Sequence, residues 1–259
     1  MLNIEYLLNV VRIAGDLALD HQNQNKVNYT NKPDNSPVTE ADIAVNNIYI
    51  EHLTNKYPDI PIISEENPHQ DNKKNLGCKY FLIDPIDGTE SFINKSPNFV
   101  SQIALIENGR PTFAAIYNPA RDELYYSNSK QSYLIHNGTR KAISVKENSP
   151  PKLYISHRLQ KKAVFDKIKK LDFQSHHTAS SYKFCILARG DADLIPYLNS
   201  IHSWDIAPPD LIIKTAGGIF LNLQGRELTY NDPSFNCENF IAASKEEHFH
   251  TCLNAIKQI

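Results

Sequence analysis

The stretch "YFLIDPIDGTESFI", residues 80–93, joins an apolar strand pattern to two aspartates three residues apart, Asp84 and Asp87. Because the residue before a proline favours an extended backbone, Asp84 is predicted to end the strand with its side chain fixed in direction. The next two residues are predicted to turn the chain, and an Asp-Gly pair then completes a tight bend. Such a bend can bring both carboxylates and the backbone carbonyl of Ile86 to one point, and hard oxygen ligands of this kind suit Mg²⁺.

Two other interpretations of the same stretch stay open at this point. A turn with acidic decoration is the plain alternative, because Asp-Gly pairs commonly form turns. A phosphatase of the haloacid dehalogenase type is the second, since its motif also places two aspartates before Gly-Thr. That motif has one residue between the aspartates, so that both side chains face the same way on a strand. The spacing of three with a proline inside disfavours Asp84 as a nucleophile.

The residues that follow the two aspartates favour a phosphate site beside the metal. If residues 89–93 open a helix, the backbone amides of Gly88 and Thr89 form its N-terminus. Such amides point at a bound anion and can hold a phosphate group.

Other carboxylates stand where predicted elements meet loops. Glu65 and Glu66 end a short strand in "IISEENP", and because adjacent side chains on a strand face opposite ways, only one of them is expected to point into a cage. Asp42, three residues after Thr39, is either the partner in a helix capping box or a group beside a metal that orients a hydroxyl or water. Asp205 in "HSWDIAPPD" is either a helix N-cap or a carboxylate that the second half of the chain contributes.

Length and composition favour a small-molecule partner. The 259 residues carry 27 basic and 29 acidic side chains, a formal charge of -2, without the long like-charged run that a nucleic acid polymer or an anionic membrane would attract. No apolar run is long enough to span a bilayer. The N-terminus reads as an amphipathic helix rather than a signal peptide, and the four cysteines stand singly, so we expect a reduced cytoplasm.

The pattern along the chain predicts two lobes. Helical spacing runs through residues 7–18 and again from Thr39 until a proline at position 58. Residues 98–145 are β-rich and contain Asn-Gly turns at 108 and 137, which predicts a largely antiparallel sheet. A polar, proline-bearing segment predicts a boundary near residue 147, between a lobe of residues 1–147 with most metal ligands and a lobe of residues 148–259 with Asp205.

Four segments in this order resemble the inositol monophosphatase family of magnesium-dependent, lithium-sensitive phosphatases: "PVTEAD", "SEE", "IDPIDGTESF" and "WDIAPPD...AGG". The resemblance covers nearly the whole chain. It is sharpest to the 3'(2'),5'-bisphosphate nucleotidase branch, through "PIISEENP" and "SSYKFCILARGDADLIPY". It implies an α/β fold, a two-lobed α-β-α-β-α layered sandwich of the inositol monophosphatase / fructose-1,6-bisphosphatase type.

The resemblance also implies a role for individual residues in a site that holds two or three Mg²⁺ ions. The implied metal ligands are Glu65, Asp84, Asp87, Asp205 and the backbone carbonyl of Ile86. The implied catalytic residues are Asp42, Glu65 and Thr89, with Thr89 hydrogen-bonded near Glu65 or Asp42 to position the attacking water. The implied substrate contacts are Glu65, Asp87, Gly88, Thr89, Ser180, Lys183 and Asp205.

The activity that the resemblance favours is hydrolysis of the 3'-phosphate of adenosine 3',5'-bisphosphate, which yields AMP and phosphate and belongs to sulfur assimilation. An inositol-1-monophosphatase or a broad sugar-phosphate phosphatase is the alternative, and a non-catalytic phosphate-binding protein on the same fold is a third. The resemblance further admits a homodimer and a peripheral association with the inner membrane.

The chain departs from the family pattern at two places. Tyr197 stands where the nucleotidases carry an arginine that helps to hold the nucleotide. Pro208 and Pro209 replace the small pair that usually follows Asp205. Prolines are tolerated in the first turn of a helix, where amides lack internal partners, so we expect the metal site to be retained.

Overall fold

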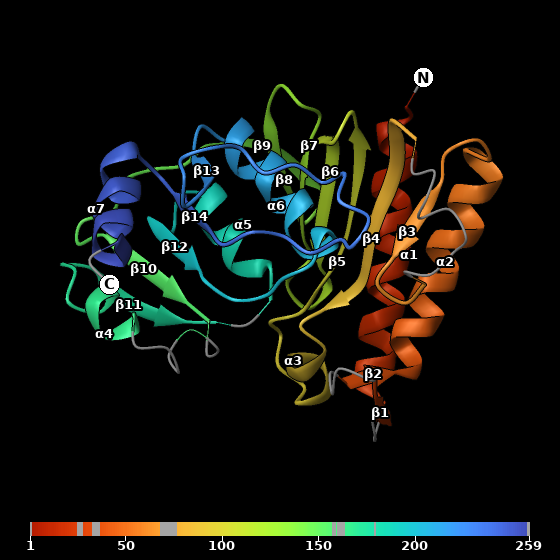
Figure 1. Cartoon of the computed structure of the whole chain (residues 1–259). Coiled ribbons are helices and arrows are strands. Elements are labelled where there is room, and N and C mark those ends of the chain that lie inside the picture. The colour runs from red at the N-terminus through yellow and green to blue at the C-terminus, as the bar shows by residue number, and fades with distance from the viewer. Residues whose placement is uncertain are drawn as a thin grey trace.

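The computed structural model describes residues 2–24, 28–32, 37–67, 77–156, 159, 164–178 and 180–257. Within these residues the chain builds five layers, which alternate between helices and sheets (Figure 1). α1 (Ile4–Asn23) and α2 (Glu40–Lys56) form the outer layer beside a seven-stranded sheet. The layered α-β-α-β-α architecture predicted from the sequence is therefore confirmed.

The seven-stranded sheet is almost entirely antiparallel, as predicted. Its strands, in spatial order, are β3 (Ile62–Ser64), β4 (Lys79–Asp87), β5 (Val100–Glu107), β6 (Arg110–Asn118), β7 (Glu123–Ser127), β8 (Ser132–His136) and β9 (Thr139–Ile143). Only the pair of β3 and β4 runs parallel. Asn108-Gly109 and Asn137-Gly138 form the predicted turns before β6 and β9, and all four residues have positive φ, as tight hairpin turns of this kind require.

A middle layer of helices separates this sheet from a second one. α5 (Tyr182–Ala188) and α6 (Ser203–Thr215) lie in this layer, where α6 packs on β6 on one side and on β13 on the other. The strands of the second sheet, in spatial order, are β11 (Gln174–His177), β10 (Lys152–Ile155), β12 (Leu194–Tyr197), β14 (Phe240–Ala243) and β13 (Ile219–Asn222). The last layer is α7 (Glu246–Lys257) with α4 (Phe165–Ile168). The short elements are β1 (Tyr29–Asn31), β2 (Pro37–Thr39), α3 (Thr89–Ile93) and the 3-10 turn η2 (Pro119–Arg121).

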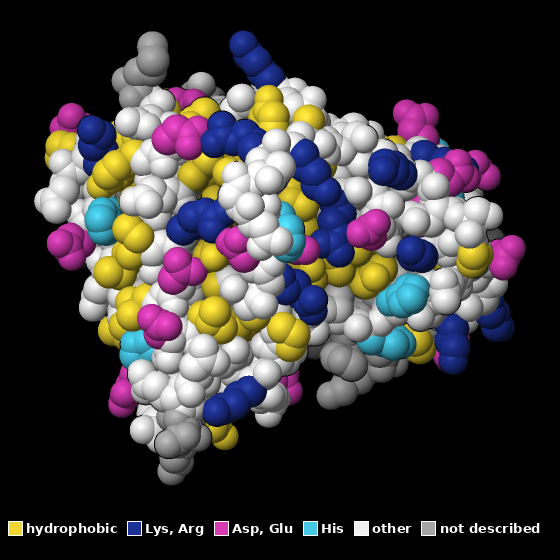
Figure 2. Space-filling view, turned by 180° about the vertical axis from the view of Figure 1, so that it is seen from behind, with side chains coloured by type: hydrophobic (Ala, Val, Ile, Leu, Met, Phe, Trp, Pro, Cys, Tyr) yellow, Lys and Arg dark blue, Asp and Glu magenta, His cyan; other side chains and the backbone are white. Residues whose placement is uncertain are grey.

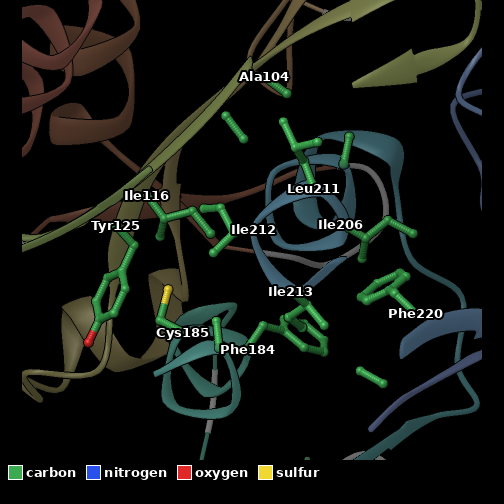
Figure 3. Close-up of a cluster of buried hydrophobic side chains, with 14 of the residues drawn as sticks. Ala104, Ile116, Tyr125, Phe184, Cys185, Ile206, Leu211, Ile212, Ile213 and Phe220 are labelled. Atoms are coloured by element: carbon green, nitrogen blue, oxygen red, sulfur yellow. The ribbon is translucent and has the colours of Figure 1, made fainter. Parts of the chain in front are cut away.

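The predicted boundary near residue 147 falls in the segment between β9 and β10. One buried apolar cluster spans this boundary, because it joins side chains of the first sheet to side chains of α5, α6 and the second sheet. Figure 3 shows Tyr125 of β7 beside Cys185 of α5. It also shows Ile212 of α6 beside Ile116 of β6, and Ile206 of the same helix beside Phe220 of β13. Full burial of a large apolar side chain stabilises a fold by roughly 1.5–3 kcal/mol. The cluster therefore holds the two halves together, and the division into lobes of residues 1–147 and 148–259 stays a prediction.

The strand that carries the two aspartates is longer than predicted. We expected it to end at Asp84, but β4 continues to Asp87, and its register against β5 shifts between these two residues. Pro85 lies inside the shift. Because proline has no N–H to give to a strand ladder, it is accommodated at such an irregularity. The shift replaces the predicted turn as the feature that sets the spacing of the two carboxylates.

The prolines of α6 also lie elsewhere than predicted. The helix begins at Ser203, so Pro208 and Pro209 fall in its second turn rather than its first. Inside a helix, proline offers no N–H to the carbonyl four residues earlier. The carbonyl of Asp205 consequently has no donor from Pro209, nor from Pro208 in 3-10 geometry.

Charges of both signs cover the surface. Seen from behind, basic side chains lie along the middle of the face, with acidic side chains among and beside them (Figure 2). Among the helices of the described ranges, none has the length and apolarity that a bilayer crossing needs.

Candidate active site

Three carboxylates from separate elements meet at one edge of the first sheet. Glu65 follows the end of β3, Asp84 lies in β4, and Asp205 lies in the first turn of α6. One carboxylate oxygen from each lies within 4.8 Å of the others. Because β3 and β4 run parallel, they carry Glu65 and Asp84 to the same edge of the sheet, and the middle layer supplies the third group.

The buried carboxylate of Asp84 needs a cation to balance its charge. Its side chain is 1% exposed, and neither carboxylate oxygen has a hydrogen-bond partner. Burial raises the pKa of Asp84 well above its ordinary value, and the charges of Glu65, Asp87 and Asp205 raise it further. A buried carboxylate without hydrogen bonds is costly unless a counter-charge or metal accompanies it. The residues therefore fit a divalent metal ion with oxygen ligands.

Asp205 serves two purposes at the start of α6. Its Oδ2 accepts a hydrogen bond from the backbone N–H of His202 at 2.9 Å, so Asp205 is the third residue of the helix and completes a capping box. The N-cap is His202, and the prediction that Asp205 itself is the N-cap was therefore wrong. Burial, followed by the charges of Asp87 and Glu65, raises the pKa of Asp205 to about 8. The capping contact holds the carboxyl group of Asp205 in place beside the carboxylates of Glu65 and Asp84.

Asp87 connects the first sheet to α5. Its carboxylate accepts a hydrogen bond from the backbone N–H of Ser181, just before the helix begins. Burial raises the pKa of Asp87, whereas the ammonium of Lys183 and the bonds from Ser181 oppose that rise. Lys183 is itself buried, donates to the carbonyl of Ser180 at 2.6 Å, and lines the pocket described below.

Thr89 does not make the predicted contact. Its hydroxyl donates to the carbonyl of Ile86 at 3.2 Å, and among the described residues it has no hydrogen bond to Glu65 or Asp42. The reason is local, because Thr89 is the first residue of α3 and its hydroxyl reaches back three residues to the Ile86 carbonyl. Gly88 has φ of 90°, and a Cβ at this position would lie 2.8 Å from the Cβ of Ser180. Glycine thus permits both the backbone conformation and the close approach of the segment before α5.

Asp42 forms the capping box that was one of its two interpretations. It accepts hydrogen bonds from the backbone N–H and the hydroxyl of Thr39, at 2.7 and 2.5 Å. Burial, despite these bonds, raises the pKa of Asp42 to about 7, and the charges of Glu66 and Glu65 contribute. Asp42 does not line the pocket, so its catalytic role stays a prediction.

Lys32 belongs to the site but was not singled out in the sequence. Its ammonium lies 2.7 Å from Oε1 of Glu65 and 2.8 Å from Oε1 of Glu66. Burial alone would lower the pKa of Lys32, but the charges and hydrogen bonds of the two glutamates raise it. Both glutamates reach one cation because β3 ends at Ser64, which removes the strand alternation assumed above. No local motif marks Lys32, since a lone lysine in a polar segment is a common surface residue.

The carboxylates open into a pocket of about 370 Å³. The residues predicted to be near metal and substrate line it, except Asp42, and the second half of the chain supplies its other wall. The lining side chains and backbone come from Pro37, Glu65, Asp84, Ile86, Asp87, Gly88, Thr89, Glu90, Ser91, Ser156, Ser180, Ser181, Lys183, Tyr197, Ser200, Ile201, His202, Trp204 and Asp205. On this wall, His202 stacks on Trp204 with ring centroids 4.6 Å apart. The pocket thus combines an acidic end with a cationic and aromatic end.

A comparison of the sequence with known protein families identifies the family of this chain. The model of the inositol monophosphatase family matches residues 3–258. The chain therefore belongs to the inositol monophosphatase family, a class of phosphatases.

Individual relatives and solved structures are also similar to this chain. A protein of Salmonella typhimurium named 3'(2'),5'-bisphosphate nucleotidase CysQ is 34% identical over 229 residues, which cover 88% of this chain and 93% of the relative. A CysQ of Buchnera aphidicola is 34% identical over 233 residues, 88% of this chain and 87% of its own. In structure, an IMPase of Thermotoga maritima has a TM-score of 0.82 at 24% identity and 98% coverage of both chains. CysQ from Bacteroides thetaiotaomicron has a TM-score of 0.79 at 23% identity, over 93% of this chain and 97% of its own. At these identities the two solved structures show a shared fold alone.

Proposed function

We propose that the protein is a magnesium-dependent phosphomonoesterase that converts adenosine 3',5'-bisphosphate to AMP and phosphate. The observation that carries the proposal is the buried carboxylate of Asp84, which has no hydrogen-bond partner and has an oxygen within 4.8 Å of oxygens of Glu65 and Asp205. The names of the CysQ relatives support the choice of substrate.

In this proposal Glu65, Asp84, Asp87 and Asp205 hold the metal ions, two or three in number, together with the carbonyl of Ile86. Bound Mg²⁺ would lower the pKa of a water molecule and neutralise phosphoryl oxygens. Asp84 has both oxygens available, whereas one oxygen of Asp87 is engaged by the N–H of Ser181. Asp84 would therefore offer both of its carboxylate oxygens to the metal ions, and Asp87 would offer the oxygen that Ser181 does not engage.

The residues around the cluster would orient the substrate. Gly88 and Thr89 begin α3 beside the carboxylates, and their amides are the proposed phosphate contacts. The hydroxyl of Thr89 is held by the Ile86 carbonyl and would have to exchange that bond to orient a water molecule, as would be needed for the proposed catalytic role with Glu65 and Asp42. Ser180 and Lys183 line the opposite wall, where a buried cation favours a second anionic group on the substrate.

One feature favours a second candidate, an inositol-1-monophosphatase or a broad sugar-phosphate phosphatase. Tyr197 stands in place of the arginine expected in a nucleotidase, and its ring stacks on Phe240 with centroids 5.4 Å apart. Lys183 is then the cation on this wall, with its ammonium 5.5 Å from the centroid of Tyr197. A single cation would hold a 5'-phosphate less firmly than a lysine and an arginine together.

Parallel assays of the metal-stripped and magnesium-loaded protein test the proposal. We expect release of phosphate from adenosine 3',5'-bisphosphate in Mg²⁺, no release in EDTA, and a lower kcat/KM with inositol 1-phosphate. A preference of more than about tenfold for inositol 1-phosphate, equivalent to ~1.4 kcal/mol in the transition state, would replace the first candidate by the second. Tight phosphate binding without turnover would instead favour the non-catalytic alternative. Lithium inhibition, a homodimer, a role in sulfur assimilation, and a cytoplasmic or membrane-peripheral location stay predictions.

A further inference from the structure

The backbone carbonyl of Asp205 has an unusual position in α6. In a regular helix it would accept a hydrogen bond from the N–H four residues on, or from the N–H three residues on if the turn tightened. Those residues are Pro209 and Pro208, and neither has an N–H. In addition, a proline ring inside a helix clashes with the carbonyl four residues earlier and pushes it away from the helix axis. For Pro209 that carbonyl is the one of Asp205.

The released carbonyl is bound by residues from other elements. The hydroxyl of Ser181 donates to it at 2.8 Å, and the side-chain amide of Gln102 lies 3.4 Å from it. Ser181 is 2% exposed and Gln102 is fully buried, so both are protected from water. Gln102 lies on β5 directly opposite Asp84 of β4. The carbonyl of Asp205 is therefore tied to the strand pair that carries Asp84 and to the segment that begins α5.

The same serine contacts a second member of the acidic cluster. While its hydroxyl donates to the carbonyl of Asp205, its backbone N–H donates to the carboxylate of Asp87. Ser181 thus links a residue of the first sheet to a residue of α6, across the space between the two halves of the chain. Ser181 thus adds a second hold on Asp205, whose carboxylate also accepts from the N–H of His202.

We propose that Pro209 is a positioning residue, which frees the carbonyl of Asp205 for Ser181 and Gln102 and so fixes the Asp205 carboxylate at the metal site. The inference rests on the proposed function in one respect, namely that Asp205 binds Mg²⁺. It gives a purpose to Pro209, one of two prolines that depart from the family pattern and lie in a part of the helix that normally excludes proline.

The substitution Pro209→Ala tests the inference, with Pro208→Ala as a matched control. Alanine at 209 restores the N–H that competes for the Asp205 carbonyl, whereas alanine at 208 restores the donor for the carbonyl of Trp204. Both changes replace proline by a better helix former, so neither should lower the melting temperature of the metal-stripped protein. We expect Pro209→Ala to raise the Kd for Mg²⁺ by about three- to tenfold, the worth of one hydrogen bond, and Pro208→Ala to change it by less than about twofold.

Isothermal titration of Mg²⁺ into the EDTA-stripped full chain, without substrate, measures these constants. The double variant Pro209→Ala/Ser181→Ala should bind Mg²⁺ no more weakly than Ser181→Ala, because both changes break the same link. Additive effects, an unchanged Kd for Pro209→Ala, or an equal loss in Pro208→Ala would overturn the inference. A wild-type chain that binds no Mg²⁺ would overturn the proposed function as well, whereas equal binding by wild type and Pro209→Ala would overturn this inference alone.

Discussion

Replacing Asp205 by asparagine should stabilise the metal-free protein while reducing or abolishing its stabilisation by magnesium. Asparagine retains an oxygen that can accept the hydrogen bond from His202, so the capping box survives. The substitution removes an acid whose pKa is raised from 3.8 to about 8 by burial and by the charges of Asp87 and Glu65. A carboxyl group with a raised pKa in the folded state contributes most to stability below its unfolded pKa, and this contribution is lost as the pH rises toward 8.

The expected magnitude follows from that shift. Each pH unit between the unfolded pKa of the carboxyl group and pH 7 lowers the free energy of unfolding by at most about 1.36 kcal/mol. At pH 7 the total is roughly 4 kcal/mol. The neighbouring acids share this cost, so we expect the substitution Asp205→Asn to raise the free energy of unfolding by about 2–4 kcal/mol at pH 7 and by about 1 kcal/mol at pH 5. For a chain of this size the gain at pH 7 corresponds to a rise in melting temperature of ~4–8 °C.

Thermal melting in EDTA and in Mg²⁺, at pH 5 and pH 7, measures both effects. Mg²⁺ should raise the melting temperature of the wild type, because a ligand that binds only the folded state stabilises it. In contrast, Asp205→Asn should show a small rise or none. The reasoning is refuted if the variant is less stable than the wild type in EDTA at pH 7, or if its advantage does not shrink at pH 5.

Three other predictions concern the site and residues around it. Lys32→Met should lower the free energy of unfolding in EDTA by about 1 kcal/mol, because Glu65 and its neighbour lose their shared cation, and an unchanged urea midpoint would contradict this. Tyr182→Phe and Tyr125→Phe should each lower the free energy of unfolding by about 1 kcal/mol, since each phenol donates a hydrogen bond to Glu123, at 2.8 and 2.7 Å. Urea unfolding of both variants measures this loss, and an unchanged free energy of unfolding in either would contradict the prediction. Asp84→Asn should reduce kcat by more than ~10²-fold while raising the melting temperature in EDTA, and a parallel loss of activity and stability would indicate a structural role instead.

Much of the fold could be predicted because its signals are local. The Thr39 cap with Asp42, the Asn-Gly turns at 108 and 137, and the start of α6 near Asp205 each depend on residues close together in the chain. The grouping of Glu65, Asp84 and Asp205 in the structure agrees with an acidic cage expected from four short motifs in the right order.

What could not be predicted depends on contacts between distant segments. Lys32 reaches Glu65 across 33 positions, and a solitary lysine has no pattern to reveal that contact. The extension of β4 to Asp87 is decided by pairing with β5, which tolerates a register shift that the motif alone does not indicate. Likewise, the position of Pro209 within α6 depends on where the helix begins, and a shift of a few residues moves a proline from a tolerated position to one that reorganises hydrogen bonds.

The division of the proposed metal ligands between the two halves has a consequence for how the molecule acquires its activity. Glu65, Asp84 and Asp87 precede the β9–β10 segment, and Asp205 follows it, so neither half carries a complete set. If the chain were cut in that segment, the two fragments would have to reassociate before they could bind metal in full. Magnesium would then stabilise the complex of the two fragments. The recovered phosphatase activity would measure how much of this complex forms.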